Sequence, residues 1–135
     1  MQILAPSFID SNVLLYLLSA NSEKADLAEA VMRKRGVINV QVLNEITNEM
    51  RRKFSMPWEE INEVLTIIRL VCQVEPLTTE IHDSGRKIAE RYQLGLYDAM
   101  IVAAAIAAKC ETLYSEDMQD TLMINHQLII RNPFI

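Results

Sequence analysis

Four acidic residues occupy positions from which their carboxylates could act together: Asp10, Glu45, Asp98 and Asp117. No histidine or cysteine lies beside them in the sequence, so the set supplies only oxygen ligands. Such ligands suit hard cations such as Mg²⁺ and Mn²⁺. A bound cation of this kind can activate a water for attack on a phosphodiester. The residue types therefore predict a metal-dependent hydrolytic site, provided that the fold brings the four acids together.

The elements that must position these acids can be read from the apolar pattern. We expect buried strands where short apolar runs occur, at Leu4–Ile9, Val37–Val40, Val71–Val74, Thr112–Tyr114 and Leu128–Arg131. Helical spacing and end signals predict helices between them, at Ser11–Leu18, Ser22–Arg35, Gln41–Phe54, Pro57–Leu70, Thr78–Tyr92 and Tyr97–Lys109. We expect Gly36 to close the second helix and the region of Gly95 to end the fifth. This alternation indicates an α/β fold with a parallel sheet covered on both faces.

The predicted topology places all four acids at one rim. In an open parallel sheet, the loops at the carboxyl ends of the strands form the binding crevice. Asp10 directly follows the first strand, Glu45 lies in the opening turns of the helix after the second, and Asp117 lies just past the fourth. The helix from Tyr97 leads into the fourth strand and must run antiparallel to it, so Asp98 in its first turn reaches the same edge.

Each acid also has an ordinary structural explanation. Asp10 could cap the following helix, and Asp98 could complement the dipole of its own. Glu45 could be a solvated surface residue with Glu49 as a rival for its role, and Asp117 could be a loop acid. Convergence favours the functional interpretation, because four like charges at one rim repel unless a cation compensates them.

Other polar residues are candidates for supporting roles. Asn12 and Ser115 could orient the carboxylates or a water, and local turn hydrogen bonds are an equal alternative for both. The tract Arg51, Arg52 and Lys53 follows Glu45 on the same helix and could contact the phosphates of a nucleic-acid substrate. His82 and His126 have no plausible nucleophile nearby, so we expect both at the surface.

Size and composition fit one ordinary globular domain over residues 1–135, with a mass of 15.4 kDa and 50% hydrophobic residues. The net charge of −5 argues against nucleic-acid binding by bulk electrostatics, although not against substrate binding through a cation. Cys72 and Cys110 lack metal-ligand spacing and are expected to be buried, reduced thiols. Without a signal-peptide pattern or a run long enough to span a membrane, we expect a cytoplasmic protein.

Four segments together resemble the PIN-domain family, and especially the ribonuclease toxins of type II, VapBC-like toxin–antitoxin systems. FIDSN at Phe8–Asn12 is similar to the family's opening motif, and NVQVLNEI at Asn39–Ile46 to the segment with its conserved glutamate. GLYDAMIVAAA at Gly95–Ala105 resembles the third-acid motif, and TLYSED at Thr112–Asp117 the fourth. RNPF at 131–134 is similar to the usual ending.

The resemblance implies a three-layer α/β/α sandwich with a five-stranded parallel sheet in the order 3-2-1-4-5. It also implies an Mg²⁺- or Mn²⁺-dependent endoribonuclease, commonly a homodimer, that a cognate antitoxin neutralises. By matching motifs, the catalytic and metal-binding acids are Asp10, Glu45, Asp98 and Asp117, with Asp120 as a possible substitute for Asp117. A PIN-type nuclease for rRNA processing or for DNA remains an alternative, as does a degenerate domain that only binds a partner.

Overall fold

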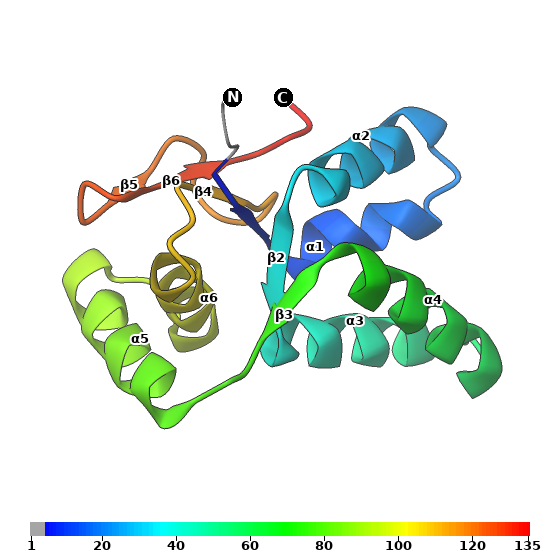
Figure 1. The fold of residues 1–135 in the computed structure, drawn as a ribbon, viewed down its shortest axis with the longest axis horizontal. Coiled ribbons are helices and arrows are strands. Elements are labelled where there is room, and N and C mark those ends of the chain that lie inside the picture. The colour runs from blue at the N-terminus through cyan, green and yellow to red at the C-terminus, as the bar shows by residue number, and fades with distance from the viewer. Residues whose placement is uncertain (1–4) are drawn as a thin grey trace.

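In the computed structural model, which describes residues 5–135, a six-stranded sheet runs through the middle of the described chain (Figure 1). Its strands are β1 (Ser7–Ile9), β2 (Gly36–Asn39), β3 (Gln73–Glu75), β4 (Thr112–Tyr114), β5 (Met123–Ile124) and β6 (Leu128–Arg131). They lie in the order β3-β2-β1-β4-β6-β5. All neighbouring pairs are parallel except β5 with β6, which is antiparallel.

The predicted α/β fold class is confirmed, with one difference at the edge of the sheet. The five predicted strands occur in the predicted order, and the strand expected last in the sequence is β6. The additional strand β5 was not predicted, because an apolar pair as short as Met123–Ile124 carries no periodicity. The predicted start of the first strand, at Leu4, lies outside the described residues.

Helices cover both faces of the sheet, as Figure 1 shows. Helices α5 (Thr79–Tyr92) and α6 (Leu96–Ala107) pack together on one face. The other face carries α1 (Ser11–Leu14), the 3₁₀ turn η1 (Leu15–Leu18), α2 (Ser22–Arg33), α3 (Val40–Arg52) and α4 (Trp58–Val71). The single helix expected over Ser11–Leu18 is thus an α-helical turn followed by a 3₁₀ turn.

Two helix ends differ from the expected glycine stops. Arg35 (φ 54°) and Gln93 (φ 55°) adopt the left-handed conformation, rather than Gly36 and Gly95. Gly36 instead begins β2, where an added Cβ would lie 2.7 Å from the carbonyl oxygen of Met32. This glycine is needed for close packing rather than for backbone freedom.

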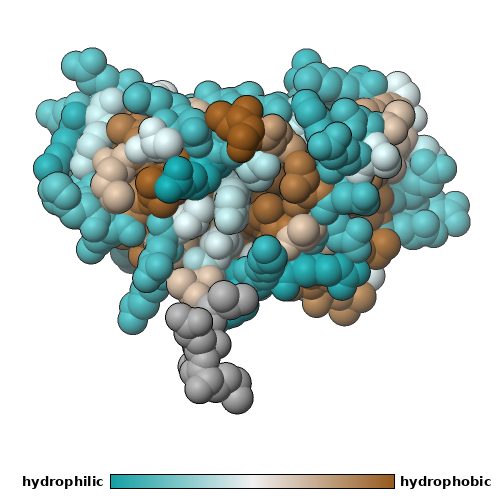
Figure 2. Space-filling model, turned by 90° about the horizontal axis from the view of Figure 1, so that it is seen from above, coloured by the Kyte–Doolittle hydropathy of each residue, from teal (hydrophilic) through white to brown (hydrophobic). Residues whose placement is uncertain are grey.

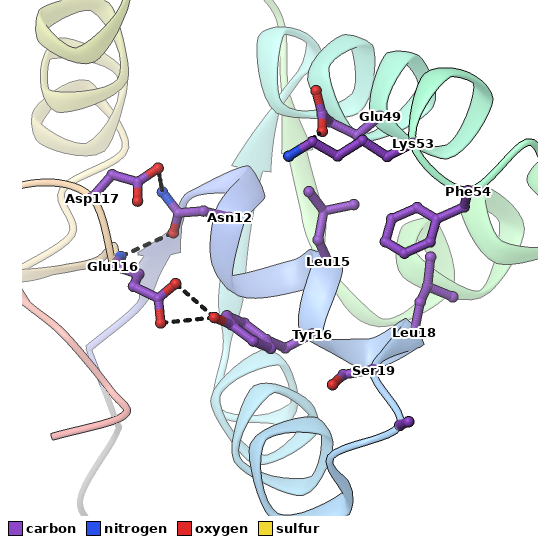
Figure 3. A pocket seen from close by; sticks show the side chains of 11 residues that line it. Asn12, Leu15, Tyr16, Leu18, Ser19, Glu49, Lys53, Phe54, Glu116 and Asp117 are labelled. Carbon is purple, nitrogen blue, oxygen red and sulfur yellow. Dashed lines mark hydrogen bonds and ion pairs between the residues drawn. The ribbon is translucent and has the colours of Figure 1, made fainter.

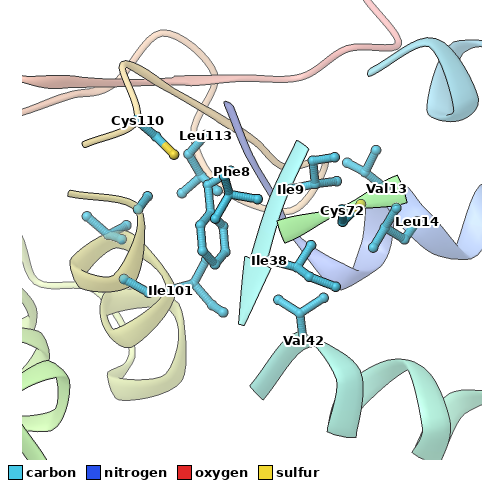
Figure 4. Close-up of a cluster of buried hydrophobic side chains, with 14 of the residues drawn as sticks. Phe8, Ile9, Val13, Leu14, Ile38, Val42, Cys72, Ile101, Cys110 and Leu113 are labelled. Atoms are coloured by element: carbon cyan, nitrogen blue, oxygen red, sulfur yellow. The ribbon is translucent and has the colours of Figure 1, made fainter. Parts of the chain in front are cut away.

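The core lies between the sheet and its two helical layers. Figure 4 shows Phe8 and Ile9 of β1 among side chains from neighbouring elements, including Ile38, Ile101 and Leu113. All five are at most 1% exposed. Among the described helices, α6 is the most buried, with every residue from Ala99 to Ala105 buried. The core therefore fixes the strand ends that carry the candidate site.

The surface agrees with the remaining expectations. Cys72 and Cys110 are free and buried, and both histidines are exposed. Figure 2 shows hydrophobic side chains in separate groups among hydrophilic ones on the face seen from above Figure 1. Among the described residues, no helix combines the length and apolar character required to cross a membrane.

Candidate active site

The four predicted acids come from the carboxyl ends of strands and from helix starts at the same edge of the sheet. Asp10 follows β1, and its backbone N–H donates to the carbonyl oxygen of Tyr114 at 2.9 Å, at the end of β4. Asn39 ends β2 and caps α3, which carries Glu45 in its second turn. Asp98 lies in the first turn of α6, and Asp117 lies in the loop after β4.

Asp10 is the most buried of the four, with a side chain only 5% exposed. Its Oδ1 accepts a hydrogen bond from the backbone N–H of Ser11 at 2.8 Å, so Asp10 does cap α1. Its Oδ2 accepts from Ser115 Oγ at 2.9 Å and from Asn12 Nδ2 at 3.1 Å. Burial raises the pKa of Asp10 from 3.8 to about 6; these hydrogen bonds offset part of the rise, and the charges of Glu45 and Asp98 add to it.

Asn12 connects the first acid to the loop that carries the last one. Besides Asp10, its Nδ2 lies 3.3 Å from Ser115 Oγ and 3.3 Å from Asp117 Oδ2. Its Oδ1 accepts the backbone N–H of Glu116 at 2.9 Å. The side chain therefore fixes the β4 loop against the start of α1, and its amide donors offset part of the repulsion between two carboxylates.

Glu45 reaches the same group from α3. Its Oε1 accepts a hydrogen bond from Ser11 Oγ at 3.2 Å. Burial raises the pKa of Glu45, contacts from Ser11 and Gln41 oppose the rise, and the charge of Asp98 adds to it. Glu49, the rival for this role, instead pairs with Lys53 at 3.1 Å. The geometry therefore groups Glu45, rather than Glu49, with the other acids.

Asp98 and Asp117 lie at the exposed side of the group. The pKa of Asp98 is raised, first by partial loss of solvent around its carboxylate and then by the charge of Asp117. Asp120, the possible substitute, turns away, because its Oδ1 accepts the backbone N–H of Asn132 at 2.8 Å. The four acids thus interact through their charges, whereas Asp120 does not belong to this group.

The donor set fits a hard divalent cation. It contains only carboxylate oxygens, with hydroxyl and amide groups behind them, as Mg²⁺ and Mn²⁺ sites require. Within residues 5–135, no three acidic, histidine or cysteine side chains stand close enough together to form a ready-made metal site. Burial is the first cause of the raised pKa values of Asp10, Glu45 and Asp98, and the charges of neighbouring carboxylates add to the rise. A bound cation would oppose both effects.

Comparisons with known proteins agree with this architecture. The profile of the PIN domain matches residues 7–120. The chain belongs to the PIN domain family. No curated protein matches the chain. Similar solved structures include a toxin–antitoxin complex from Klebsiella pneumoniae, with a TM-score of 0.73, 19% identity and coverage of 94% of this chain and 97% of that one.

Two further structures share the fold of this PIN domain. VapC20 from Mycobacterium tuberculosis, a sarcin-ricin loop cleaving toxin, has a TM-score of 0.66 and 18% identity, covering 82% of this chain and 89% of that one. VapBC2 from Rickettsia felis, bound to a DNA fragment from its promoter, has a TM-score of 0.68 and 18% identity. That likeness covers 93% of this chain and 97% of the other. At such identities these likenesses show the fold.

The predicted basic tract of this PIN domain divides into different environments. Arg51 donates to the carbonyl oxygen of Met56 at 3.0 Å, and its guanidinium lies 5.1 Å from the centre of the Trp58 ring. Arg52 is exposed. Lys53 lines two adjoining pockets beside the acids, together with Asn12 and Asp117. Of the three side chains, Lys53 is therefore the one placed beside the acids.

Several residues of the site were not predicted from the sequence. Ser11 donates to Glu45, and Gln41 Nε2 donates to the carbonyl oxygen of Tyr97 at 3.2 Å, which joins α3 to the start of α6. Tyr16 donates its hydroxyl to Glu116, with oxygen separations of 2.7 and 2.9 Å (Figure 3). These contacts left no signal in the sequence, because each joins residues far apart along the chain.

Proposed function

We propose that this PIN domain is a metal-dependent endoribonuclease and the toxin of a toxin–antitoxin pair. The observation that carries the proposal is the convergence of Asp10, Glu45, Asp98 and Asp117, whose carboxylates repel one another at the carboxyl edge of the sheet. Clusters of perturbed carboxylates are typical of functional sites. Membership of the PIN domain family and the toxins among the similar structures support the same conclusion.

Asp10 and Asp98 would be the principal ligands of Mg²⁺ or Mn²⁺, and Glu45 and Asp117 would complete the site directly or through water. When bound, the cation would supply an activated water and neutralise charge on the cleaved phosphodiester. Burial and the hydrogen bonds from Asn12 and Ser115 hold Asp10 in one orientation. The orientation of the Asp10 carboxylate is therefore set before a cation binds.

Glu45 is suited to accept the proton of the attacking water. Its raised pKa moves it toward the operating pH, which favours proton transfer by a carboxylate. Ser11 donates to Oε1 of Glu45, and the contacts from Ser11 and Gln41 hold the carboxylate in place. With water as the nucleophile, the products are a 5′-phosphate and a 3′-hydroxyl. A nuclease for rRNA processing or for DNA would share this chemistry.

The same likenesses support the proposed substrate and partners. One similar protein is described as a sarcin-ricin loop cleaving toxin, which supports RNA as the substrate. Others are described as toxin–antitoxin complexes, which supports a cognate antitoxin. We extend the proposal to a homodimer in the cytoplasm.

The test is cleavage of end-labelled structured RNAs by the purified, partner-free protein with Mg²⁺, Mn²⁺ or EDTA. Asp98→Asn should lower cleavage at least about 100-fold, because loss of a metal ligand costs more than loss of a supporting contact. Asp120→Asn is the matched control. It removes the same charge but keeps an acceptor for the N–H of Asn132, so it should cleave normally.

Equal cutting by wild type and Asp98→Asn would show contamination by another ribonuclease. Absence of cutting by wild type with every metal would favour a domain that only binds a partner.

A further inference from the structure

A pocket of about 510 Å³ lies between η1, the end of α3 and the loop that carries Asp117 (Figure 3). Its apolar wall consists of Leu15, Leu18 and Phe54, and Asp117 links it to the acidic group. A second pocket, of about 380 Å³, contains Glu45 and shares Asp117 with the first. The two pockets therefore form one continuous surface from the acids to Phe54.

Phe54 presents a large part of its ring to this surface. Its side chain is 47% exposed although the residue is apolar. The chain around it is well fixed: the N–H of Lys53 donates to the carbonyl oxygen of Glu49 at 2.8 Å, and that of Met56 to Met50 at 3.1 Å. Ser55 between them adopts the left-handed conformation, with φ of 49°. The ring thus forms an aromatic surface just beyond the end of α3, on a segment that these two backbone hydrogen bonds hold.

The polar side chains along the pocket favour a particular class of ligand. Glu45, Glu49 and Lys53 follow one face of α3 at intervals of one turn, so Lys53 lies about 12 Å along the helix from Glu45. Lys53 is 72% exposed, and its ion pair with Glu49 at 3.1 Å is a surface pair that a phosphate could replace. Glu116 lines the pocket as well, and its carboxylate oxygens accept from the Tyr16 hydroxyl and keep lone pairs for a second donor. A planar base with N–H donors, attached to a phosphate, satisfies both features.

We propose that this pocket binds a nucleobase of single-stranded RNA, stacked on Phe54, next to the cleaved phosphodiester. Lys53 contacts a phosphate of the same strand, and the carboxylates of the pocket accept N–H groups of the base. Stacking on an aromatic ring is available to every base, and Phe54 lies in this pocket beside Leu15, Leu18 and the ring of Tyr16. The pocket volume is also within the range of small-ligand sites, about 300–1,000 Å³. The inference rests on the proposed function and adds a residue that binds the substrate.

The test compares three substitutions of Phe54 with a control aromatic. Phe54→Ala should lower kcat/KM for a single-stranded RNA substrate about 5- to 150-fold, as expected for loss of one stacked base. Phe54→Leu should show most of the same decrease in kcat/KM, because leucine keeps apolar bulk but has no π face. Phe54→Tyr should keep kcat/KM within about twofold of wild type. Trp58→Ala is the control, because Trp58 is 54% exposed and lies outside the pocket.

Binding of an RNA oligonucleotide carrying 2-aminopurine, measured in an Asp98→Asn background, gives a readout independent of cleavage. Quenching of the base that disappears in Phe54→Leu and persists in Phe54→Tyr would support the assignment. Equal binding and quenching by Phe54→Ala would overturn it and leave the pocket to an apolar protein side chain. Metal-dependent cleavage that ignores all Phe54 variants would also overturn it, while the proposed nuclease function would stand. Base binding that depends on Phe54, without cleavage by wild type, would support the pocket assignment and contradict the proposed nuclease function.

Discussion

Replacing Asp10 by asparagine should stabilise the metal-free protein, although it removes a proposed metal ligand. Asp10 is 5% exposed, and its pKa rises from 3.8 to about 6. Each pKa unit corresponds to about 1.4 kcal/mol, so ionisation of this buried group costs folding about 3 kcal/mol above pH 7. Asparagine removes the charge but disturbs the hydrogen bonds from Asn12 and Ser115. We therefore expect a net gain of about 1–2 kcal/mol.

The sign of the pH dependence follows from the direction of the shift. A carboxyl group whose pKa is higher in the folded state than in the unfolded state costs stability once both forms are ionised. The cost disappears as pH falls from above 6 toward 4. The advantage of Asp10→Asn over wild type should therefore be largest at about pH 7.5 and shrink toward pH 4.

Urea unfolding in EDTA at several pH values measures this difference, with Asp120→Asn as the control that should show no comparable gain. Addition of Mg²⁺ should reverse the order, because it stabilises only a protein that binds it, by about 2.7 kcal/mol at 100 times Kd. A less stable Asp10→Asn protein at neutral pH, or a difference that does not change with pH, would refute the reasoning about Asp10.

Two further predictions concern the contacts that hold the site and its helices. Asn12→Asp removes the amide donor between Asp10 and Asp117 and adds a like charge, so it should lower the free energy of unfolding in EDTA by about 2–4 kcal/mol. In urea titrations, Mg²⁺ should recover much of this loss. An unchanged urea midpoint in EDTA would contradict the role given to Asn12. Gly85→Ala should lower the free energy of unfolding by about 1–3 kcal/mol, because the added Cβ would lie 2.7 Å from Met100 Cγ at the contact of α5 with α6. Thermal unfolding measures this loss. An unchanged unfolding temperature would mean that α5 and α6 can move apart at little cost.

The sheet and the arrangement of the acids could be predicted because they depend on strong local signals. Apolar runs that end at Asp10 and before Ser115, with the alanine-rich helix between Gly95 and the fourth strand, define strand directions, and direction determines the edge. By contrast, β5 is a very short strand held by its pairing with β6, a long-range contact that no local pattern records.

The contacts within the site were less accessible to prediction than its acids. The choice between Asp117 and Asp120 depends on which loop residue faces Asn12, and that is decided by the backbone after β4. Hydrogen bonds such as Tyr16 to Glu116 join positions far apart in the sequence, so spacing carries no trace of them. For the same reason, the pocket beside Phe54 became visible only in the folded chain.

The central claim is that these four carboxylates form a site for a divalent cation. Calorimetric titration of the partner-free protein with Mn²⁺ tests it most directly, alongside Asp98→Asn and the control Asp120→Asn. The account predicts saturable binding by wild type and by the control, and affinity at least about 10-fold weaker in Asp98→Asn. No binding by wild type, or equal binding by all three proteins, would contradict the assignment of this edge of the sheet as a metal site.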